Sequence, residues 1–346
     1  MNLQARIDIL NDLSQFIQTE KSILGHVMEA AYLKNKWFTV ANQQLALQAI
    51  DENYLVTSLL ENWTNNYLSD PSYYPISPKR VALIPAGNIP LVGFHDVLCI
   101  FLSGHSLVIK YSEKDQVLSP FIVRKLKELA EKKGIEWKVE EVEQLRNFDA
   151  VIATGSNNTA RYFEYYFGHY PNIIRRNRNG IAVLNGKEQK EDLIALGMDV
   201  FQYFGLGCRN ISKLYVPNDY NFDPLLEALY EFKEVMWHEP YKNNFDYNYA
   251  VHSLGKESFQ ANGCILIKEA KAIPSRIGVL HFEYYTSLEG LKEKLLEERE
   301  SIQCLVSQIP LSITGIEAFR FGEAQQPNLF NYADGIDTLS FLISLQ

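Results

Sequence analysis

The 346-residue chain has only four cysteines, and no two of them form a C-x-x-C pair. Cys99, Cys208, Cys264 and Cys304 are too widely spaced to suggest a disulfide framework or a zinc site. The sequence also lacks an apolar run near the roughly 18 residues that a membrane span needs. Its first residues mix charged and apolar side chains at helical spacing, unlike a signal peptide. We therefore expect a cytoplasmic protein with reduced thiols and no membrane span.

The sequence also has fewer basic than acidic residues, 33 against 42, so its formal net charge is −9. This charge argues against a nucleic-acid partner, since binding to phosphates requires a basic face. No G-x-G-x-x-G follows the first strand, and no phosphate loop, G-x-S-x-G elbow or H-E-x-x-H motif occurs. The seven histidines are scattered. We therefore expect no metal site and find little support for a hydrolase or a kinase.

What the sequence does contain is a change of hydrophobic rhythm near residue 80. Apolar residues recur every three or four positions over the first seventy residues, which predicts amphipathic helices that end at Asp70-Pro71-Ser72. Strands are then expected at 81–85, 106–111, 150–154 and 181–184. Helices are expected after Pro90, near 116–133, from Ser156, and up to Phe204. This alternation predicts an α/β protein with a parallel sheet, whose ligands collect at the carboxyl ends of the strands.

The rest of the chain repeats less regularly. We expect strands at 211–216, 264–268, 277–282 and 302–306, and helices from about 223 and over 288–299. The tail DGIDTLSFLISL is expected to form a short strand or helix that returns to the first domain.

Three polar segments follow predicted strands. PAGNIP places Asn88 where its amide can donate into a crevice above the sheet, although turn Asn residues often bond only locally. LVIKYSE places Lys110, Ser112 and Glu113 after the next strand, where charged groups can hold ribose hydroxyls or simply face solvent. In ATGSNN, Gly155 and Ser156 open a helix whose free amides can bind a cofactor, although Gly-Ser is also a good helix entry.

A fourth segment, GLGCRN, puts Cys208 in a glycine-flanked turn between a predicted helix and a predicted strand. Such a cysteine can offer a sulfur nucleophile, and its backbone amide can stabilise an oxyanion. A cysteine without context is more often buried and inert. Cys99, Cys264 and Cys304, which lie in apolar runs, fit that second class.

The order of these four segments resembles the aldehyde dehydrogenase superfamily, where N-x-P, K-x-x-E, F-T-G-S and G-Q-x-C occur in the same order. PAGNIP and the ADGID tail more narrowly resemble the LuxC-like acyl-CoA reductases. The resemblance implies Cys208 as nucleophile and Asn88 as oxyanion donor. It also implies Lys110, Ser112 and Glu113 at the adenosine ribose, and Gly155 with Ser156 beside a nicotinamide.

The resemblance also implies a domain organisation. A helical N-terminal segment (1–75) would pack on a parallel-sheet cofactor-binding domain (76–205). A smaller α/β catalytic domain (206–312) would follow, and residues 313–346 would return to the cofactor domain. The nucleophile would lie in the cleft between the two domains, and the protein would form a homo-oligomer.

One departure narrows the chemistry. Hydrolytic aldehyde dehydrogenases carry a glutamate before the cysteine that activates water, but residues 170–186 of this chain contain no acidic residue. Without a general base, hydrolysis of an acyl-enzyme should be slow, whereas exchange with a thiol needs no activated water. The cluster Arg175-Arg176-Asn177-Arg178 in this region would either attract CoA or cofactor phosphates or form a solvated basic face.

We therefore predict an NAD(P)H-dependent reduction of an acyl thioester, such as a fatty acyl-CoA, to an aldehyde through a Cys208 acyl-enzyme. The resemblance implies NADPH, but Glu113 would repel a 2′-phosphate, so NADH remains the alternative. Other readings are an acyl-phosphate reductase, an inactive nucleotide- or acyl-binding protein, and a plain acyltransferase. His238 is a candidate proton donor. The aromatic stretches 162–170 and 235–250 would line an acyl channel or pack in a core or interface.

Overall fold

The computed structural model describes residues 3–67 and 77–345, which form two compact units. Unit 1 comprises residues 1–177 and 328–346, and unit 2 comprises residues 178–327. The predicted functional boundaries after residues 75, 205 and 312 stay predictions. The first of these, like the predicted break at Asp70-Pro71-Ser72, lies outside the described residues.

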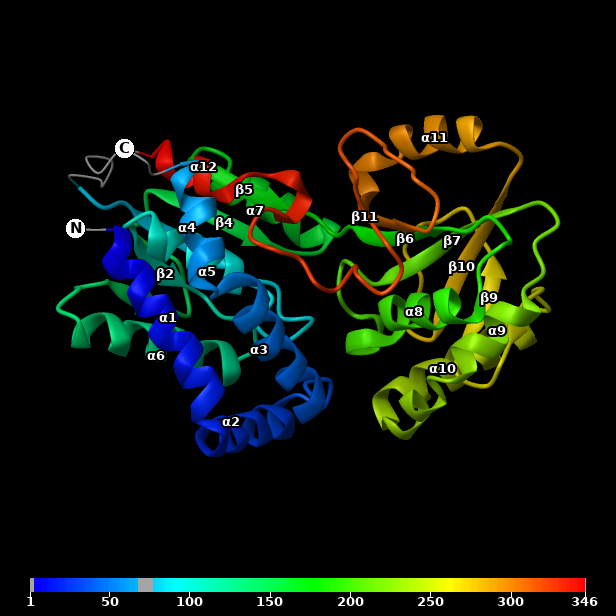
Figure 1. Ribbon diagram of the computed structural model, residues 1–346, viewed down its shortest axis with the longest axis horizontal. Coiled ribbons are helices and arrows are strands. Elements are labelled where there is room, and N and C mark those ends of the chain that lie inside the picture. The colour runs from blue at the N-terminus through cyan, green and yellow to red at the C-terminus, as the bar shows by residue number, and fades with distance from the viewer. Residues whose placement is uncertain (1–2, 68–76, 346) are drawn as a thin grey trace. The chain divides into compact units, whose positions relative to one another are not determined.

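Unit 1 begins with a series of helices and continues as alternating strands and helices (Figure 1). Its helices are α1 (Leu3–Thr19), α2 (Lys21–Lys34), α3 (Val40–Tyr54), α4 (Thr57–Asn65), α5 (Phe94–Leu102), α6 (Leu118–Lys132), α7 (Asn157–Phe167) and α12 (Thr338–Ile343), with the 3₁₀ turn η5 (Ala333–Gly335). Its strands are β1 (Arg80–Ile84), β2 (Ser106–Ile109), β3 (Val139–Glu141), β4 (Ala150–Thr154) and β5 (Asn172–Arg175).

These strands form sheet A, in the order β3-β2-β1-β4-β5 with every pair parallel. The chain builds outward from β1 to β2 and β3, and then crosses back to β4 on the other side of β1. The three central strands β2, β1 and β4 are short apolar runs buried on both faces, as expected for a parallel sheet that helices cover. The carboxyl ends of β2, β1 and β4 consequently lie next to one another at one edge of sheet A.

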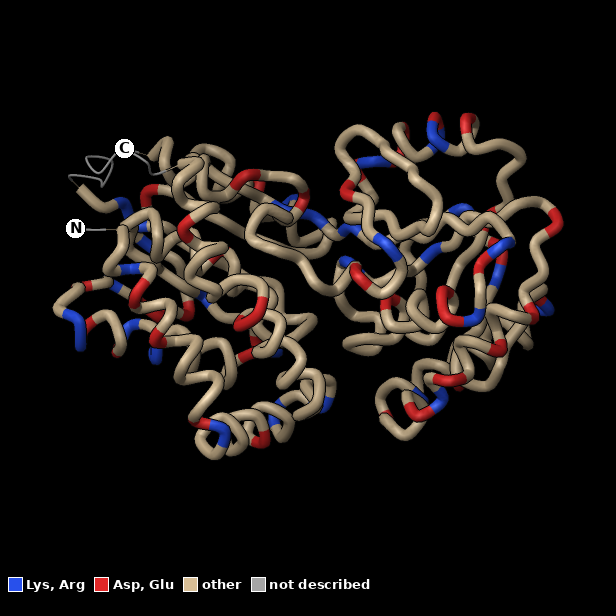
Figure 2. Tube along the Cα trace, viewed as in Figure 1, with Lys and Arg blue, Asp and Glu red and all other residues tan. Residues whose placement is uncertain are grey.

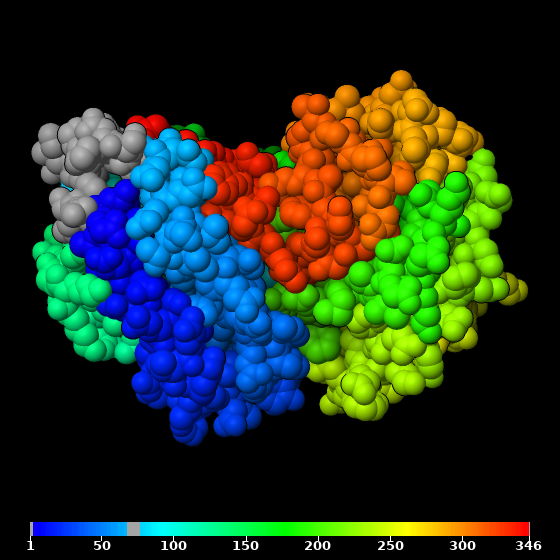
Figure 3. All heavy atoms as spheres, viewed as in Figure 1, coloured from blue at the N-terminus to red at the C-terminus, as the bar shows by residue number. Residues whose placement is uncertain are grey.

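The N-terminal helices and the C-terminal tail share the core of unit 1. Leu10, Leu13, Leu339 and Leu342 are fully buried in the same apolar cluster. A chain of hydrogen bonds joins the two ends of the sequence: Trp63 Nε1 donates to Tyr332 Oη (2.9 Å), and Tyr332 Oη donates to Tyr67 Oη (2.9 Å). The helices at the start of the chain, blue in Figure 3, form much of the visible surface of this unit.

Unit 2 contains a second, larger sheet with helices. Its helices are α8 (Lys190–Phe201), α9 (Asp223–Tyr230), α10 (Glu239–Leu254) and α11 (Leu288–Glu297), with the 3₁₀ turns η2 (Gln202–Gly205), η3 (Lys233–Trp237) and η4 (Arg299–Ser301). Its strands are β6 (Asn179–Val183), β7 (Ile211–Pro217), β8 (Gln260–Ala261), β9 (Leu266–Glu269), β10 (Val279–Tyr285), β11 (Ile302–Ser307) and β12 (Glu317–Phe319). Sheet B has the order β12-β11-β6-β7-β10-β9-β8, in which only the β8–β9 pair is antiparallel.

The predicted α/β class, the N-terminal helices and the main strands are confirmed. The helix expected to run to Phe204 instead ends at Phe201, because Tyr203 and Phe204 leave the helical conformation. The tail is helical (α12). The sequence analysis missed α10 and four strands, β3, β5, β8 and β12. Among the described residues, no helix is both long enough and apolar enough to cross a membrane.

Candidate active site

The predicted cofactor residues lie on three neighbouring loops at the carboxyl edge of sheet A. Asn88 follows β1, Lys110 follows β2, and Gly155 follows β4. The Lys110 amide donates to the Leu83 carbonyl (3.0 Å), which keeps the β2 loop against β1. Because β1 is the strand at which the strand order reverses, its carboxyl end is the place where doubly wound sheets bind ligands.

The β1 and β2 loops touch at Gly87. A Cβ at this position would overlap the Oγ and Cβ atoms of Ser112, so only glycine allows this approach. Asn88, which is half-buried, directly follows Gly87 in the chain and therefore lies close to the loop that carries Lys110 and Glu113. The structure therefore brings together two segments that the sequence analysis proposed separately: the one with Asn88 and the one with Lys110 and Ser112.

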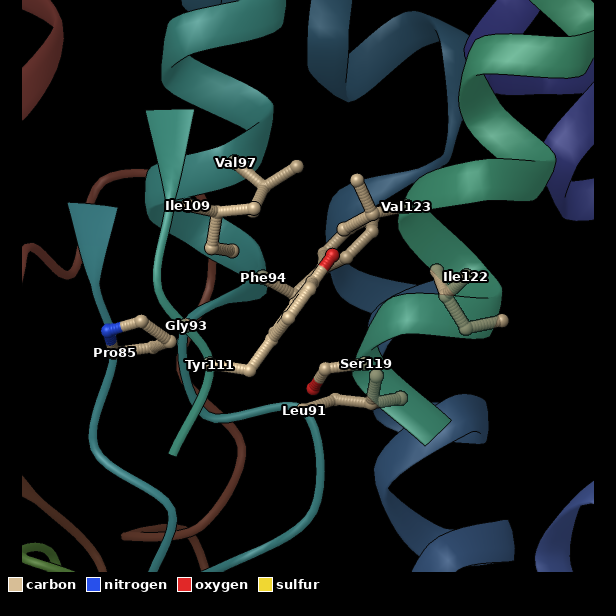
Figure 4. A pocket seen from close by; sticks show the side chains of 10 residues that line it. All are labelled: Pro85, Leu91, Gly93, Phe94, Val97, Ile109, Tyr111, Ser119, Ile122 and Val123. Carbon is tan, nitrogen blue, oxygen red and sulfur yellow. The ribbon is translucent and has the colours of Figure 1, made fainter. Parts of the chain in front are cut away.

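Tyr111 orients the residues on either side of it. Its ring points from the end of β2 into an apolar pocket between α5 and α6, where it packs with Phe94 and Val123 (Figure 4). The packed side chains leave only about 10 Å³ of free space. Because successive side chains of an extended segment alternate in direction, an inward Tyr111 turns Lys110 outward. Burial raises the pKa of the Tyr111 hydroxyl.

Lys110 and Glu113 are both exposed. Within residues 3–67 and 77–345, neither side chain takes part in an ion pair. Their exposure agrees with the alternative that these charges simply face solvent, and their role at a ribose stays a prediction. Both charges remain available to a polar ligand at this edge of the sheet.

Gly155 and Ser156 form the entry to α7. Ser156 Oγ accepts a hydrogen bond from the Thr159 amide (3.2 Å), which is a standard N-cap. A Cβ on Gly155 would lie 2.9 Å from Thr159 Cβ, so the close turn requires glycine. Ser156, Asn157 and Asn158 are exposed, and the amides of the first helical turn lie at the same edge of sheet A as the β1 loop.

Cys208 belongs to unit 2, where it lies in the turn of residues 206–210 between η2 and β7. It is half-buried, whereas Cys99, Cys264 and Cys304 are buried. Burial raises the pKa of Cys264 to about 11 and that of Cys304 to about 12. The expectation that these three thiols are inert core residues agrees with their burial.

The backbone before Cys208 has an unusual conformation. Tyr203 (φ 53°), Phe204 (φ 59°) and Gly205 (φ 75°) are all left-handed. A left-handed conformation is disfavoured for residues with a Cβ and is frequently found at functional sites. These three residues turn the chain sharply from the end of α8 into the Cys208 turn.

Two polar residues that the sequence analysis missed surround this turn. Asn210 is buried, its Oδ1 accepts from the Gly207 amide (2.7 Å), and its Nδ2 donates to the Asp199 and Gln202 carbonyls (2.9 and 2.8 Å). The carboxylate of Asp199 accepts from the amides of Gly322 and Ala324 (2.7 and 3.0 Å). An Asn two residues after the cysteine predicts a turn, but nothing in the sequence reveals these distant partners.

His238 lies against the segment that leads to Cys208. Its ring stacks on Phe204, with ring centroids 4.0 Å apart, and burial lowers its pKa. Its suggested role as proton donor stays a prediction. Nearby, Arg209 pairs with Glu317 (3.1 Å).

The structure corrects the interpretation of the Arg175–Arg178 cluster. Arg175 is buried and forms a two-fold ion pair with Asp96 (2.7 and 2.9 Å), and it also donates to Thr338 (2.8 Å). Arg175 therefore neither binds a phosphate nor faces solvent. Arg176 pairs with Glu164 and Arg178 with Glu300. Figure 2 shows Lys and Arg interspersed with Asp and Glu along the trace.

The two aromatic stretches differ in their environment. Tyr162, Tyr165 and Tyr166 on α7 are exposed, so they do not pack in a core of unit 1. On α10, Tyr241 and Phe245 are buried, as core packing requires.

Solved structures similar to this chain are aldehyde dehydrogenases. Aldehyde dehydrogenase 21 from Physcomitrella patens has a TM-score of 0.70 at 10% identity, over 100% of this chain and 84% of that one. An acetylating aldehyde dehydrogenase from Geobacillus thermoglucosidasius has a TM-score of 0.63 at 12% identity, over 95% and 86%. A Mycobacterium tuberculosis aldehyde dehydrogenase complexed with NAD+ has a TM-score of 0.63 at 12% identity, over 90% and 74%. These similarities confirm the predicted fold.

Comparison of the sequence itself leads to a family. No curated protein matches the chain. The family model described as acyl-CoA reductase (LuxC) matches residues 3–219, which is more than half of the chain. The protein therefore belongs to the acyl-CoA reductase (LuxC) family and has the aldehyde dehydrogenase fold.

Proposed function

We propose that this protein reduces an acyl thioester, such as a fatty acyl-CoA, to an aldehyde through an acyl-enzyme on Cys208. Family membership supports oxidoreductase activity of the acyl reductase or aldehyde dehydrogenase type. The single observation that carries the finer proposal is the Cys208 turn. A half-buried thiol follows a strained left-handed segment there, whereas the other three thiols are buried in the cores of the units.

In the proposed reaction, the Cys208 thiolate attacks the carbonyl carbon of the acyl thioester. The backbone amide of Cys208 donates to the oxyanion, and the family resemblance implies the side-chain amide of Asn88 as a second donor. The carbonyl re-forms, the bond between the carbon and the CoA sulfur breaks, and the CoA thiolate leaves and takes a proton from solvent. A bound nicotinamide supplies the hydride that reduces the acyl group. The C–S bond to Cys208 then breaks, which releases the aldehyde and restores the thiolate.

The carboxyl edge of sheet A fits a nicotinamide cofactor. Gly87 lets the β1 loop lie directly against Ser112, where a Cβ would not fit, and Lys110 and Glu113 offer charges that are not in ion pairs with other described residues. The exposed amides at the start of α7 suit a pyrophosphate or a nicotinamide amide group. Lys110, Ser112, Glu113, Gly155 and Ser156 would hold this cofactor.

We take NADPH as the cofactor, as the family resemblance implies. NADH is the alternative, because the exposed Glu113 carboxylate would repel the 2′-phosphate of NADPH. Fluorescence titration of the protein with each cofactor compares the two affinities directly. A lower dissociation constant for NADH would reverse this choice without affecting the role of Cys208.

The segment that contains β5 and β6 supports reduction of the acyl-enzyme by hydride rather than its hydrolysis by water. Residues 170–186 contain no acidic side chain, and Arg175 within them is already paired with Asp96. Hydrolysis of the acyl-enzyme would therefore lack the base that typically contributes about 10²–10⁴-fold in rate.

The four cysteines form no disulfide within the described residues, which is compatible with a reducing compartment, and we include a cytoplasmic location in the proposal. A homo-oligomer stays a prediction, which light scattering would test.

The test is peptide mass spectrometry after mixing the protein with acyl-CoAs of different lengths, first without and then with NADPH. We expect acylation at Cys208, with Cys99, Cys264 and Cys304 unmodified as internal controls, and loss of the acyl group as aldehyde when NADPH is added. Cys208→Ala should show neither acylation nor NADPH oxidation. Asn88→Ala should acylate about 10²–10³-fold more slowly, because it lacks one oxyanion donor.

The same experiment separates the alternatives. Acylation by acyl phosphates but not by acyl-CoA would identify an acyl-phosphate reductase. Acylation that NADPH does not reverse would identify an acyltransferase, and cofactor binding without turnover would identify an inactive binding protein. NADPH oxidation that persists in Cys208→Ala would refute the proposal.

A further inference from the structure

Asn210 makes more side-chain hydrogen bonds than its position in a short turn requires. It lies two residues after Cys208 and is only 2% exposed. Its Oδ1 accepts from the Gly207 amide, and its Nδ2 donates to the carbonyls of Asp199 and Gln202. The Asn210 backbone amide also donates to the Gly207 carbonyl (3.1 Å). The side chain therefore uses both of its donors and its acceptor on the segment that surrounds the thiol.

These bonds join the two sides of the left-handed segment. The Asp199 and Gln202 carbonyls lie before Tyr203 and Phe204, whereas Asn210 and Gly207 lie after them. Left-handed residues with a Cβ are disfavoured, so surrounding contacts have to hold them in place. Asn210 supplies such contacts across the segment.

The same bonds change the electrostatics around the turn. The carbonyl groups at the end of a helix have no partners within the helix, and together they carry partial negative charge. Cys208 follows the carboxyl end of α8, where such charge disfavours a thiolate. Two of these carbonyls, at Asp199 and Gln202, accept hydrogen bonds from Asn210 Nδ2.

We propose that Asn210 is a positioning residue for Cys208: its amide fixes the turn that carries the thiol and covers the carbonyl end of α8. This inference rests on the proposed role of Cys208 as nucleophile. Asn210 itself need not touch the substrate.

The test compares Asn210→Ala with Asn248→Ala, a matched control in the same unit. Asn248 is 1% exposed and donates to the carbonyls of Asn244 and Ile277 (2.9 and 3.0 Å), so its loss also removes buried hydrogen bonds. The first readout is the rate of iodoacetamide alkylation at Cys208, followed by peptide mass spectrometry from pH 6 to pH 10. The second is hydrogen exchange at the Gly207 amide.

In Asn210→Ala, we expect the midpoint of the alkylation profile to rise by about 0.2–0.7 pH unit. This rise corresponds to a fall of about 1.6- to fivefold in the thiolate fraction at pH 7, the size of a typical helix-terminus effect. The Gly207 amide should exchange faster, because it loses its acceptor. Asn248→Ala should change neither readout. A profile for Asn210→Ala that matches those of the wild type and Asn248→Ala would overturn the proposal.

Asn210→Asp serves as a second variant if Asn210→Ala does not fold. Its carboxylate still accepts from Gly207 but has no donor for the two carbonyls, so the midpoint should again rise, while Gly207 stays protected. An unchanged midpoint would count against the proposal. Alkylation does not depend on acyl-CoA, so a wild-type protein that acyl-CoA fails to acylate would refute the proposed function and leave this test intact.

Discussion

The buried carboxylate of Asp199 should make the stability of unit 2 depend on pH in a defined direction. Asp199 is fully buried on α8 and accepts hydrogen bonds from the Gly322 and Ala324 amides. Burial raises its pKa from 3.8 to about 7, an effect that these two bonds and the nearby Glu323 modify. The folded state therefore keeps a proton on Asp199 that the unfolded state has already lost.

Linkage gives the sign and the size of the effect. Because the folded state binds more protons between about pH 4 and pH 7, its free energy of unfolding falls as the pH rises through this window. A shift of about three pKa units corresponds to about 4 kcal/mol over the whole window. Between pH 5 and pH 8 the loss is about 3 kcal/mol, because part of the titration lies below pH 5.

Asp199→Asn removes this titration, because an amide stays neutral. At pH 5, where Asp199 is protonated in the folded wild type, the variant should be about 1–3 kcal/mol less stable than the wild type, since one buried amide loses its acceptor. The difference in unfolding free energy between the wild type and the variant should therefore shrink by about 3 kcal/mol from pH 5 to pH 8.

Urea unfolding at the two pH values, followed by pulsed thiol labelling of Cys304, measures this difference within unit 2, because Cys304 is fully buried there. Asp219→Asn, at an exposed position in the same unit, is the control. A difference between wild type and Asp199→Asn that does not change with pH would refute the reasoning.

Three further predictions concern unit 1. Arg175→Met leaves the Asp96 carboxylate buried without its partner and should lower the urea stability of this unit by about 3–5 kcal/mol; a loss below about 1 kcal/mol would contradict a buried pair. Gly87→Ala forces the β1 loop away from Ser112, so fluorescence titration should show at least about tenfold weaker cofactor binding, since small displacements of positioning groups are costly. Unchanged affinity would argue against a role of the Gly87–Ser112 contact in cofactor binding. Tyr332→Phe removes the hydroxyl that joins the C-terminal tail to α4 and should lower the free energy of unfolding, measured by thermal denaturation, by about 1–2 kcal/mol. An unchanged free energy of unfolding would show that this hydroxyl does not stabilise the unit.

Arg175 shows where sequence reasoning was wrong. An arginine is exposed more often than not, so the sequence favoured a solvated or phosphate-binding cluster. The partners of Arg175 are Asp96 and Thr338, which lie 79 and 163 residues away along the chain. The choice between a buried and an exposed arginine therefore depended on contacts that no local pattern encodes. The missed strand β5 lies in the same region and ends at Arg175.

The Cys208 turn also combines features that the sequence reveals with features that only the structure reveals. A glycine-flanked cysteine after a helix is visible in the sequence, and so are the polar segments that follow β1, β2 and β4. These features are local, because turn residues, strand periodicity and helix caps each depend on a few neighbouring positions. The left-handed Tyr203 and Phe204 were not visible, since aromatic residues do not favour that conformation.

The sequence by itself determined the fold class and the order of the main strands along the chain, and it predicted Cys208 as the nucleophile among four cysteines. Tertiary structure alone decided that the β1, β2 and β4 loops meet at one edge of sheet A, that Gly87 touches Ser112, and that Asp199 and Asn210 surround the thiol's turn. The physical reason is that periodicity and turn chemistry act over a few residues. Burial, charge pairing and close backbone approach instead depend on segments that become neighbours only when the chain folds.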